Sequence, residues 1–291
     1  MKYVFEICIF LVILFLYLHI YFHLKVSNDL EVYSVDEPSK DKLEEICDLR
    51  QPFYFNFNNK TLKEICTLEN LEENYGAFDI NLRDVSNLDE NNELGLPFIL
   101  SEALEILQND KQSRFIAELN KDFLEETAVV KQYQYNDSFL RPPLVSSCSY
   151  DFMTGSLNSK TVLRYNLNYR NYYLILEGKV RIKMTPPKNE KYLYCNKDYD
   201  NFEFRSPLNV WNIQDEYKSD FNKIKFLEVD LEPGNLIYIP AYWWYSIQVL
   251  EENTSILSFK YRTYMNNVAI LPQLILKIMQ KQNIKHKIID N

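Results

Sequence analysis

The chain has 291 residues, of which 46% are hydrophobic, enough for one large domain or two small ones with a substantial core. The formal net charge of −9 argues against nucleic-acid binding, because affinity for phosphate backbones depends on an excess of Lys and Arg. The three histidines are His19, His23 and His286, so residues 24–285 contain none. No Ser-His-Asp or Cys-His nucleophile can therefore form within that range.

A long apolar segment opens the chain. Residues 3–24 contain only three polar breaks, and at about 1.5 Å per residue they span roughly 33 Å, close to the thickness of bilayer hydrocarbon. A cleaved secretory signal is the alternative, but no small-x-small cleavage pattern follows. We predict that residues 1–24 are an uncleaved, single-pass membrane anchor. Its topology stays open because Lys2 and Lys25 flank it almost symmetrically.

The next segments lead into the domain. Residues 25–40 are polar and acidic, and we predict a linker between membrane and domain. Residues 41–139 are predicted to be a mixed α/β lead-in. Apolar residues at helical spacing predict a helix over 39–49, and a capping box formed by Thr61 and Glu64 predicts another.

Two further patterns in this lead-in predict different elements. Phe53, Phe55 and Phe57 occupy alternate positions, and this period of two predicts a half-buried strand. A helical region is predicted from residue 101 onwards. One of its faces is expected to contain Phe115, Ile116, Leu119 and Phe123.

From residue 140 onwards the pattern indicates β-strands. Residues 171–176 are apolar and aromatic, and after Gly178 an alternation of apolar and basic residues begins at Val180. Because Glu177 and Gly178 suit a tight turn, we predict that the two segments pair as a hairpin with one solvent-exposed face. A loop-rich insertion is expected over residues 188–222.

The most informative stretch is 231–261, which reads LEPGNLIYIPAYWWYSIQVLEENTSILSFKY. Pro233 and Gly234 suit the central positions of a type II turn, because proline presets φ and glycine accepts a positive φ. Strands are predicted on both sides of Pro240, which cannot donate to a ladder. Residues 140–265 are therefore predicted to be the main β domain.

The C-terminal segment, residues 266–291, is predicted to be a helix and tail. Its apolar residues recur at helical spacing, which is most typical of a face that docks on its own core. A protein partner or a homo-oligomer is the other interpretation. The stripe consists of Val268, Leu271, Leu274, Ile275, Ile278 and Met279.

The cysteines outside the apolar segment are even in number. Two disulfides are possible if the domain faces an oxidising compartment, and free buried thiols are the alternative. The four residues are Cys47, Cys66, Cys148 and Cys195.

The pattern Gly-x-x-Ile-Tyr-Ile-Pro-x-x-Trp-Trp at residues 234–244 resembles the JmjC/cupin-like oxygenases that use 2-oxoglutarate and iron(II), especially their asparaginyl-hydroxylase branch. The resemblance covers residues 140–265 best. It implies a mainly β fold with an α/β N-terminal part: a double-stranded β-helix, or jelly roll, behind a single transmembrane helix. Membrane-anchored cupin-like proteins of large DNA viruses are similar in organisation.

In those enzymes two histidines and one carboxylate bind iron(II). The resemblance places these ligands at Tyr165, Leu167 and Tyr245, so all three are replaced. Neutral phenols are poor substitutes, because a phenol must lose its proton to bind a metal well. We predict that Tyr165 and Tyr245 fill the former metal cavity by stacking or hydrogen bonding. Two family pocket positions, Asn171 and Tyr173, do match.

These observations predict a protein that is not an enzyme and that uses no metal or cofactor. Its expected role is that of a membrane-anchored binding or structural module. One alternative is a 2-oxoglutarate-dependent oxygenase with an atypical metal site at Tyr165 and Tyr245. The other is a virion assembly or membrane structural protein.

Overall fold

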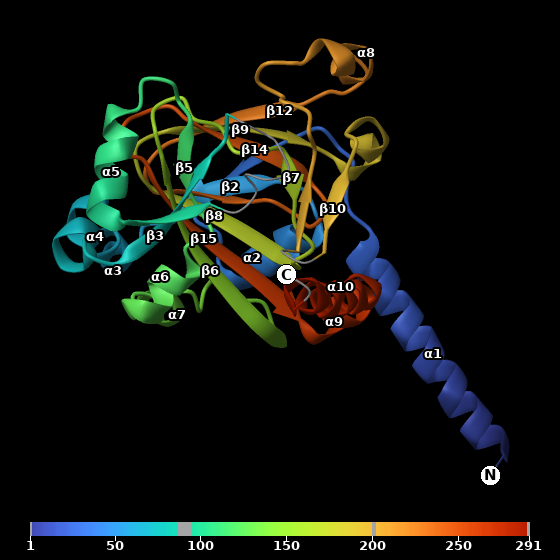
Figure 1. Cartoon of the computed structure of the whole chain (residues 1–291). Coiled ribbons are helices and arrows are strands. Elements are labelled where there is room, and N and C mark those ends of the chain that lie inside the picture. The colour runs from blue at the N-terminus through green and yellow to red at the C-terminus, as the bar shows by residue number, and fades with distance from the viewer. Residues whose placement is uncertain (1, 87–94, 200–201, 290–291) are drawn as a thin grey trace.

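Two β-sheets form the body of the protein, and the first helix projects away from them (Figure 1). The computed structural model describes residues 2–86, 95–199 and 202–289. Met1 of the predicted anchor, residues 87–94 of the lead-in and the last two residues of the predicted C-terminal segment lie outside this range.

Within the described residues, nine strands form the larger sheet. In spatial order they are β1 (Tyr33–Val35), β2 (Phe53–Asn56), β13 (Asn235–Tyr238), β8 (Arg170–Glu177), β15 (Ser255–Thr263), β6 (Val145–Gly155), β5 (Phe115–Ala117), β3 (Asp79–Asp84) and β4 (Leu96–Ile99). All neighbours pair antiparallel except β1 and β2.

Six strands form the smaller sheet in the same described part of the chain. Their order is β10 (Asn196–Asp198), β11 (Glu203–Arg205), β7 (Arg164–Tyr165), β14 (Trp244–Val249), β9 (Val180–Thr185) and β12 (Leu227–Leu231). The predicted insertion over 188–222 therefore contributes β10 and β11 to this sheet. Antiparallel pairing holds throughout.

Helices cover one side of the larger sheet, and helices also form the first and last elements of the chain (Figure 1). They are α1 (Lys2–Leu24), α2 (Lys40–Asp48), α3 (Lys60–Ile65), α4 (Leu68–Tyr75), α5 (Leu100–Asn109), α6 (Lys121–Glu126), α7 (Val130–Asn136), α8 (Lys218–Phe221), α9 (Tyr264–Ala269) and α10 (Leu271–Ile289), with 3₁₀ turns η2 (Pro187–Tyr192) and η3 (Asp215–Tyr217). Of the helices described, α1 is the one long and apolar enough to cross a membrane.

Three hydrophobic clusters separate these layers. The first lies between the larger sheet and the N-terminal helices, the second between the two sheets, and the third under the 188–222 insertion and α10. Strand β8 is buried on both faces, since Tyr172 belongs to the first cluster and Tyr173 to the second. This explains why its sequence is a continuous apolar run.

From β6 to β9 and again from β12 to β15, consecutive strands alternate between the two sheets. β12 and β14 belong to the smaller sheet, whereas β13 and β15 belong to the larger one. The prediction that 171–176 and 180–184 pair as a hairpin is therefore wrong. β8 pairs with β13 and β15, and β9 pairs with β12 and β14, so both hydrogen-bonding edges of each strand are already used.

Two glycine turns carry the chain between sheets. Gly234 has φ +91°, and the amide of Asn235 donates to the Glu232 carbonyl at 3.0 Å, which confirms the predicted turn around Pro233 and Gly234. Gly178 has φ +68° and packs against Thr254. A side chain there would meet both backbone strain and a steric clash.

The N-terminal lead-in follows the sequence patterns only in part. The helix over 39–49 and the strand at Phe53 are confirmed as α2 and β2. The helix predicted through Phe115 is wrong, because residues 115–117 form β5 between β3 and β6. The capping box is also wrong, since the side chain of Asn59, two residues before Thr61, accepts from the Leu62 amide.

The C-terminal segment is two helices, separated at Ile270, with Pro272 in the first turn of α10. Ile270 is buried and Leu274 packs against the third cluster. The rest of the predicted stripe is exposed, so the expected docking on its own core is wrong for Val268, Leu271, Ile275, Ile278 and Met279.

All five cysteines are free thiols in this structure, which contradicts the disulfide alternative. Cys47 is buried and lies 3.1 Å from the phenol oxygen of Tyr172. Burial raises the pKa of Cys66 to about 12, so this thiol stays protonated and packs as an apolar group.

Replacement of Gly178 by Ala should lower the free energy of unfolding by about 1–3 kcal/mol, because Ala strains the positive φ and its Cβ would lie 2.1 Å from Thr254 Oγ1. Urea unfolding of the full chain in detergent measures this. Gly234→Ala is the control and should cost less. Its added Cβ would lie 3.0 Å from the nearest atom, Asn56 Oδ1, which belongs to a side chain that can move. Equal costs for the two variants would contradict the packing argument.

Candidate functional site

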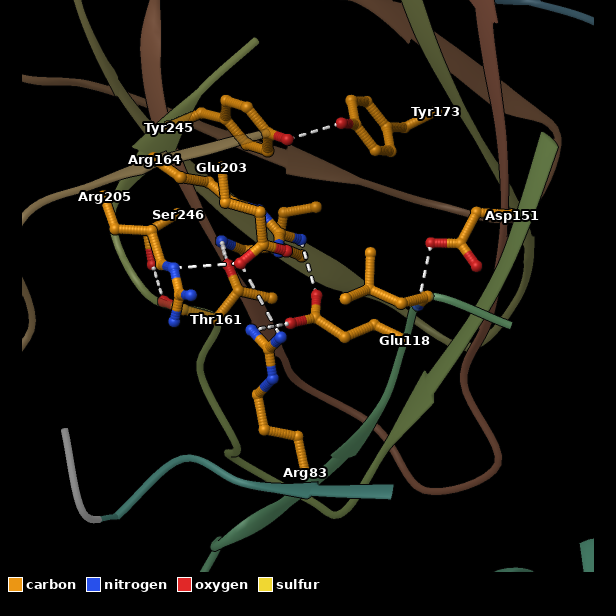
Figure 2. A network of polar contacts seen from close by, with 12 residues as sticks. Arg83, Glu118, Asp151, Thr161, Arg164, Tyr173, Glu203, Arg205, Tyr245 and Ser246 are labelled. Atoms are coloured by element: carbon orange, nitrogen blue, oxygen red, sulfur yellow. Dashed lines mark hydrogen bonds and ion pairs between the residues drawn. The ribbon is translucent and has the colours of Figure 1, made fainter. Parts of the chain in front are cut away.

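A pair of tyrosines meets between the two sheets. Tyr245 on β14 and Tyr173 on β8 are buried, and their phenol oxygens lie 2.5 Å apart (Figure 2). The side-chain amide of Asn166 donates to Tyr245 Oη at 2.8 Å and to Tyr173 Oη at 3.2 Å. The position where the resemblance expects an iron ligand is thus occupied by a phenol that is hydrogen-bonded to protein side chains.

Arg164 lies on the same side as this tyrosine pair. It is the partner of Tyr245 in the antiparallel pairing of β7 and β14, and directly opposed residues project from the same face. Its guanidinium carbon is 5.8 Å from the centre of the Tyr245 ring. Arg164 Nη2 also donates to Glu118 Oε2 at 2.6 Å, which links the tyrosines to a set of buried charges (Figure 2).

The buried charges form a connected series. Glu118 Oε1 pairs with Arg83 Nη1 at 2.9 Å, and Arg83 Nη2 lies 3.7 Å from Glu203 Oε2. Glu203 also pairs with Arg205 Nε at 2.9 Å. We call Arg164, Glu118, Arg83, Glu203 and Arg205 the ion-pair series. Its inner members are almost fully buried, with Glu118 only 1% exposed.

The charge state of Glu118 follows from its neighbours. Burial alone would raise its pKa, but the guanidinium groups of Arg164 and Arg83 outweigh burial and lower the pKa to about 2. Glu118 is therefore a carboxylate at neutral pH. Burial alone would lower the pKa of Arg164, but the Glu118 carboxylate outweighs burial and holds that pKa well above its usual value.

Backbone hydrogen bonds hold Glu118 in place. The next residue, Leu119, has φ +63°, which turns the chain after β5. The amides of Leu119 and Asn120 donate to the carboxylate of Asp151 on β6, at 3.1 and 2.7 Å. The Asn120 side chain donates to the Phe152 carbonyl at 2.8 Å. The turn is thereby attached to the sheet, and the Glu118 side chain is aimed between the sheets.

Two of the predicted site residues point elsewhere. Tyr165 and Leu167 belong to the third hydrophobic cluster, and the Tyr165 ring lies 4.7 Å from that of Trp244. The predicted contact between Tyr165 and Tyr245 is therefore wrong, because side chains alternate along a strand. Arg164 and Asn166 occupy the face toward Tyr245 instead.

The two matched pocket positions have different roles. Tyr173 joins the tyrosine pair, as described above. The Asn171 side chain donates to the carbonyls of Ile239 and Asn168 at 3.1 and 3.3 Å. Asn171 therefore connects β8 to the segment after β13, which is a structural role.

The residues between the sheets do not fit a divalent metal. Over residues 2–86, 95–199 and 202–289, no group of three or more His, Cys, Asp or Glu side chains could hold one. Burial, followed by the proximity of Tyr245, raises the pKa of Tyr173 well above its usual range, so that phenol stays protonated. Both oxygens of Glu118 are already paired with arginines. Iron(II) would meet guanidinium groups instead of anionic or imidazole donors.

The ion-pair series escaped the sequence reasoning, although a signal for it exists. Arg83, Glu118 and Arg164 each come directly after an apolar residue, in Leu-Arg, Ala-Glu and Leu-Arg. An ionisable residue within a buried strand indicates a buried partner of opposite charge. The partner itself is set by the sheet arrangement and not by sequence distance.

The mainly β fold, with a polar site between two sheets, is consistent with a cupin-like domain. The model of the cupin-like domain family matches residues 26–267, so this chain belongs to that family. The match begins directly after α1, which sets the apolar helix apart from the family domain.

Individual relatives match a shorter part of the chain than the family model does. HSPB1-associated protein 1 of Rattus norvegicus is 27% identical over 101 residues, which is 34% of this chain and 21% of that protein. The same protein of Bos taurus and of Homo sapiens is 26% identical over the same length. The aligned region thus spans about a fifth of these relatives.

Replacement of Glu118 by Gln should destabilise the protein by about 3–5 kcal/mol, because two buried arginines lose their counter-charge. Urea unfolding provides the measurement. Glu228→Gln is the matched control, because it breaks the partly exposed Lys183–Glu228 pair on β9 and β12 and should cost less than about 1 kcal/mol. Similar costs for both variants would show that the ion-pair series contributes little.

The same pair should produce acid sensitivity. Folding lowers the Glu118 pKa from 4.5 to about 2, so its contribution to stability is complete above its unfolded pKa. That contribution is lost as the pH falls through the folded value. Unfolding midpoints of the native chain should therefore drop between about pH 5 and pH 2.5 by more than those of Glu118→Gln. Parallel pH profiles would contradict this assignment.

Proposed function

We propose that this protein is a membrane-anchored, cupin-like protein that has lost iron and 2-oxoglutarate chemistry and acts as a binding or structural module. The observation that carries the proposal is Glu118 paired with Arg83 and Arg164 in the space that faces Tyr245. The alternation of consecutive strands between two sheets also supports the double-stranded β-helix, or jelly-roll, assignment.

Electrostatics explains how such a replacement removes metal chemistry. Guanidinium groups repel a cation, and the repulsion is strong where water is excluded. The buried polar side chains find hydrogen-bond partners within the protein. Arg164 donates to Glu118, and Asn166 donates to both phenols. The scaffold is thus held together by protein groups and needs no metal for its stability.

Contacts of α1 with the domain support an uncleaved anchor. His23, in its last turn, is 6% exposed, and its ring lies 5.1 Å from that of Tyr169. The Arg50 guanidinium carbon lies 4.8 Å from the centre of the Phe22 ring and 4.4 Å from that of the Tyr169 ring. A segment removed after secretion would leave this buried arginine without one of its two aromatic partners.

Purified full-length protein, incubated anaerobically with iron(II) or cobalt(II), should contain well below one equivalent of metal after desalting. It should also fail to decarboxylate 2-oxoglutarate. The reason is the guanidinium-lined interior, and metal analysis together with succinate detection provides the measurement. One tightly held equivalent, lost on Tyr245→Phe, would overturn the proposal and favour an oxygenase with an atypical site.

The anchor predicts that the protein stays in the membrane pellet after alkaline carbonate extraction and that its intact mass includes residues 1–24. A Leu14→Arg, Phe15→Arg double variant should move it to the supernatant, because each central charge costs about 3 kcal/mol in a membrane helix. Leu96→Arg, on the exposed edge strand β4, is the control and should not change the distribution. A mature mass that lacks these residues would establish a cleaved signal instead.

A further inference from the structure

Helix α10 presents its apolar side outward. Over residues 271–280 the exposed positions are all apolar, whereas the half-buried ones are Gln273, Leu274, Lys277 and Gln280. This is the reverse of the usual amphipathic helix, which buries its apolar face on the domain. The exposed side chains are Leu271, Pro272, Ile275, Leu276, Ile278 and Met279, with fractional exposures for the larger residues of 42–60%.

The inner side of α10 is fixed to the domain, which keeps the apolar side turned out. Leu274 packs against the third hydrophobic cluster. The Lys277 ammonium lies 4.8 Å from the centre of the Phe202 ring. Both residues therefore orient the helix, and the side chains on its opposite side are exposed over residues 271–280.

Helix α9, which directly precedes α10, connects it to the base of α1. Helix α9 lies beside the last turns of α1, and Thr263 Oγ1 is 3.5 Å from His23 Nε2 (Figure 1). A groove of about 620 Å³ between them is lined mainly by apolar residues, among them Leu18, Phe22 and Met265. Leu144, which is exposed, also lines this groove, and α9 adds the exposed side chains of Tyr264 and Val268.

We propose that the exposed apolar side chains of α9, α10 and Leu144, here named the α10 face, form a second membrane contact in the headgroup region of the bilayer that α1 crosses. This inference rests on the proposed anchor. Because α9 packs on the end of α1 and α10 follows directly, the α10 face lies where the anchor would leave the hydrocarbon. Apolar helix faces of this kind insert at the boundary between headgroups and acyl chains, and tyrosine is favoured there.

A second contact has a mechanical consequence. A single helix would let the domain tilt and rotate, whereas a helix and a surface patch together define one orientation. Helix α8 lies at the end of the body away from α1, so it would point away from the membrane (Figure 1). The module would then present a constant surface to its surroundings.

Fluorescence quenching by lipids tests this arrangement in the full-length chain. Three single variants, Ile278→Trp, Leu14→Trp and Leu96→Trp, are reconstituted into phosphatidylcholine vesicles with or without brominated acyl chains. The unsubstituted chain supplies the background of Trp211, Trp243 and Trp244. We expect the tryptophans at 278 and 14 to lose at least half of their added emission in brominated vesicles, and the one at 96 to lose none.

The outcomes separate this inference from the proposed anchor. Quenching at 14 without quenching at 278 would overturn the second contact and leave the anchor intact. No quenching at either position would overturn both. A residue 278 that is unquenched by lipid but shielded from aqueous acrylamide, in a chain that cross-links as a dimer, would identify the α10 face as a protein interface instead. Ile275→Trp repeats the test at a neighbouring exposed position, in case Ile278→Trp disturbs the helix.

Discussion

The carboxylate of Glu118 makes two buried arginines possible between the sheets. Removing a guanidinium from water is costly unless a carboxylate pairs with it, and Glu118 uses one oxygen for Arg83 and the other for Arg164. The three residues lie on β3, after β5, and on β7, so the pairs join the larger sheet to the smaller one. Loss of the central charge would leave two cations facing each other in a region of low dielectric constant.

The same ion pairs occupy the space between the two sheets of this cupin-like domain. The family enzymes that the sequence resembles place a cation between the sheets and hold it with histidines and a carboxylate. In this chain the fixed positive charges are guanidinium groups, and Tyr173, Tyr245 and Asn166 satisfy one another beside them. The space between the sheets is thus polar and filled by protein groups that bond to one another, whereas α1 and α10 expose apolar side chains.

Local signals in the sequence predicted the local features well. The turn at Pro233 and Gly234, the helix α2 and the apolar length of α1 depend on residues close in sequence. Features that depend on distant residues were predicted poorly. Phe115 has a helix-compatible pattern, yet it forms a strand because β5 pairs with β3 and β6. Gly178 connects the two sheets and does not close a hairpin. The site shows the same limit. The resemblance placed a site residue at Tyr165, whereas the residue beside Tyr245 is Arg164. Neighbouring residues of a strand point to opposite faces, so an error of one position selects the wrong face. Arg164 and Glu118 are 46 residues apart, which no spacing rule could have anticipated.

The most direct test of the central claim is a crystal structure of the protein grown anaerobically with cobalt(II) and 2-oxoglutarate, with anomalous diffraction recorded at the cobalt edge. The account predicts no anomalous peak between the sheets, and electron density in which Glu118 contacts both Arg83 and Arg164. A cobalt ion bound beside Tyr173 and Tyr245, with the keto acid next to it and the arginines displaced, would contradict it.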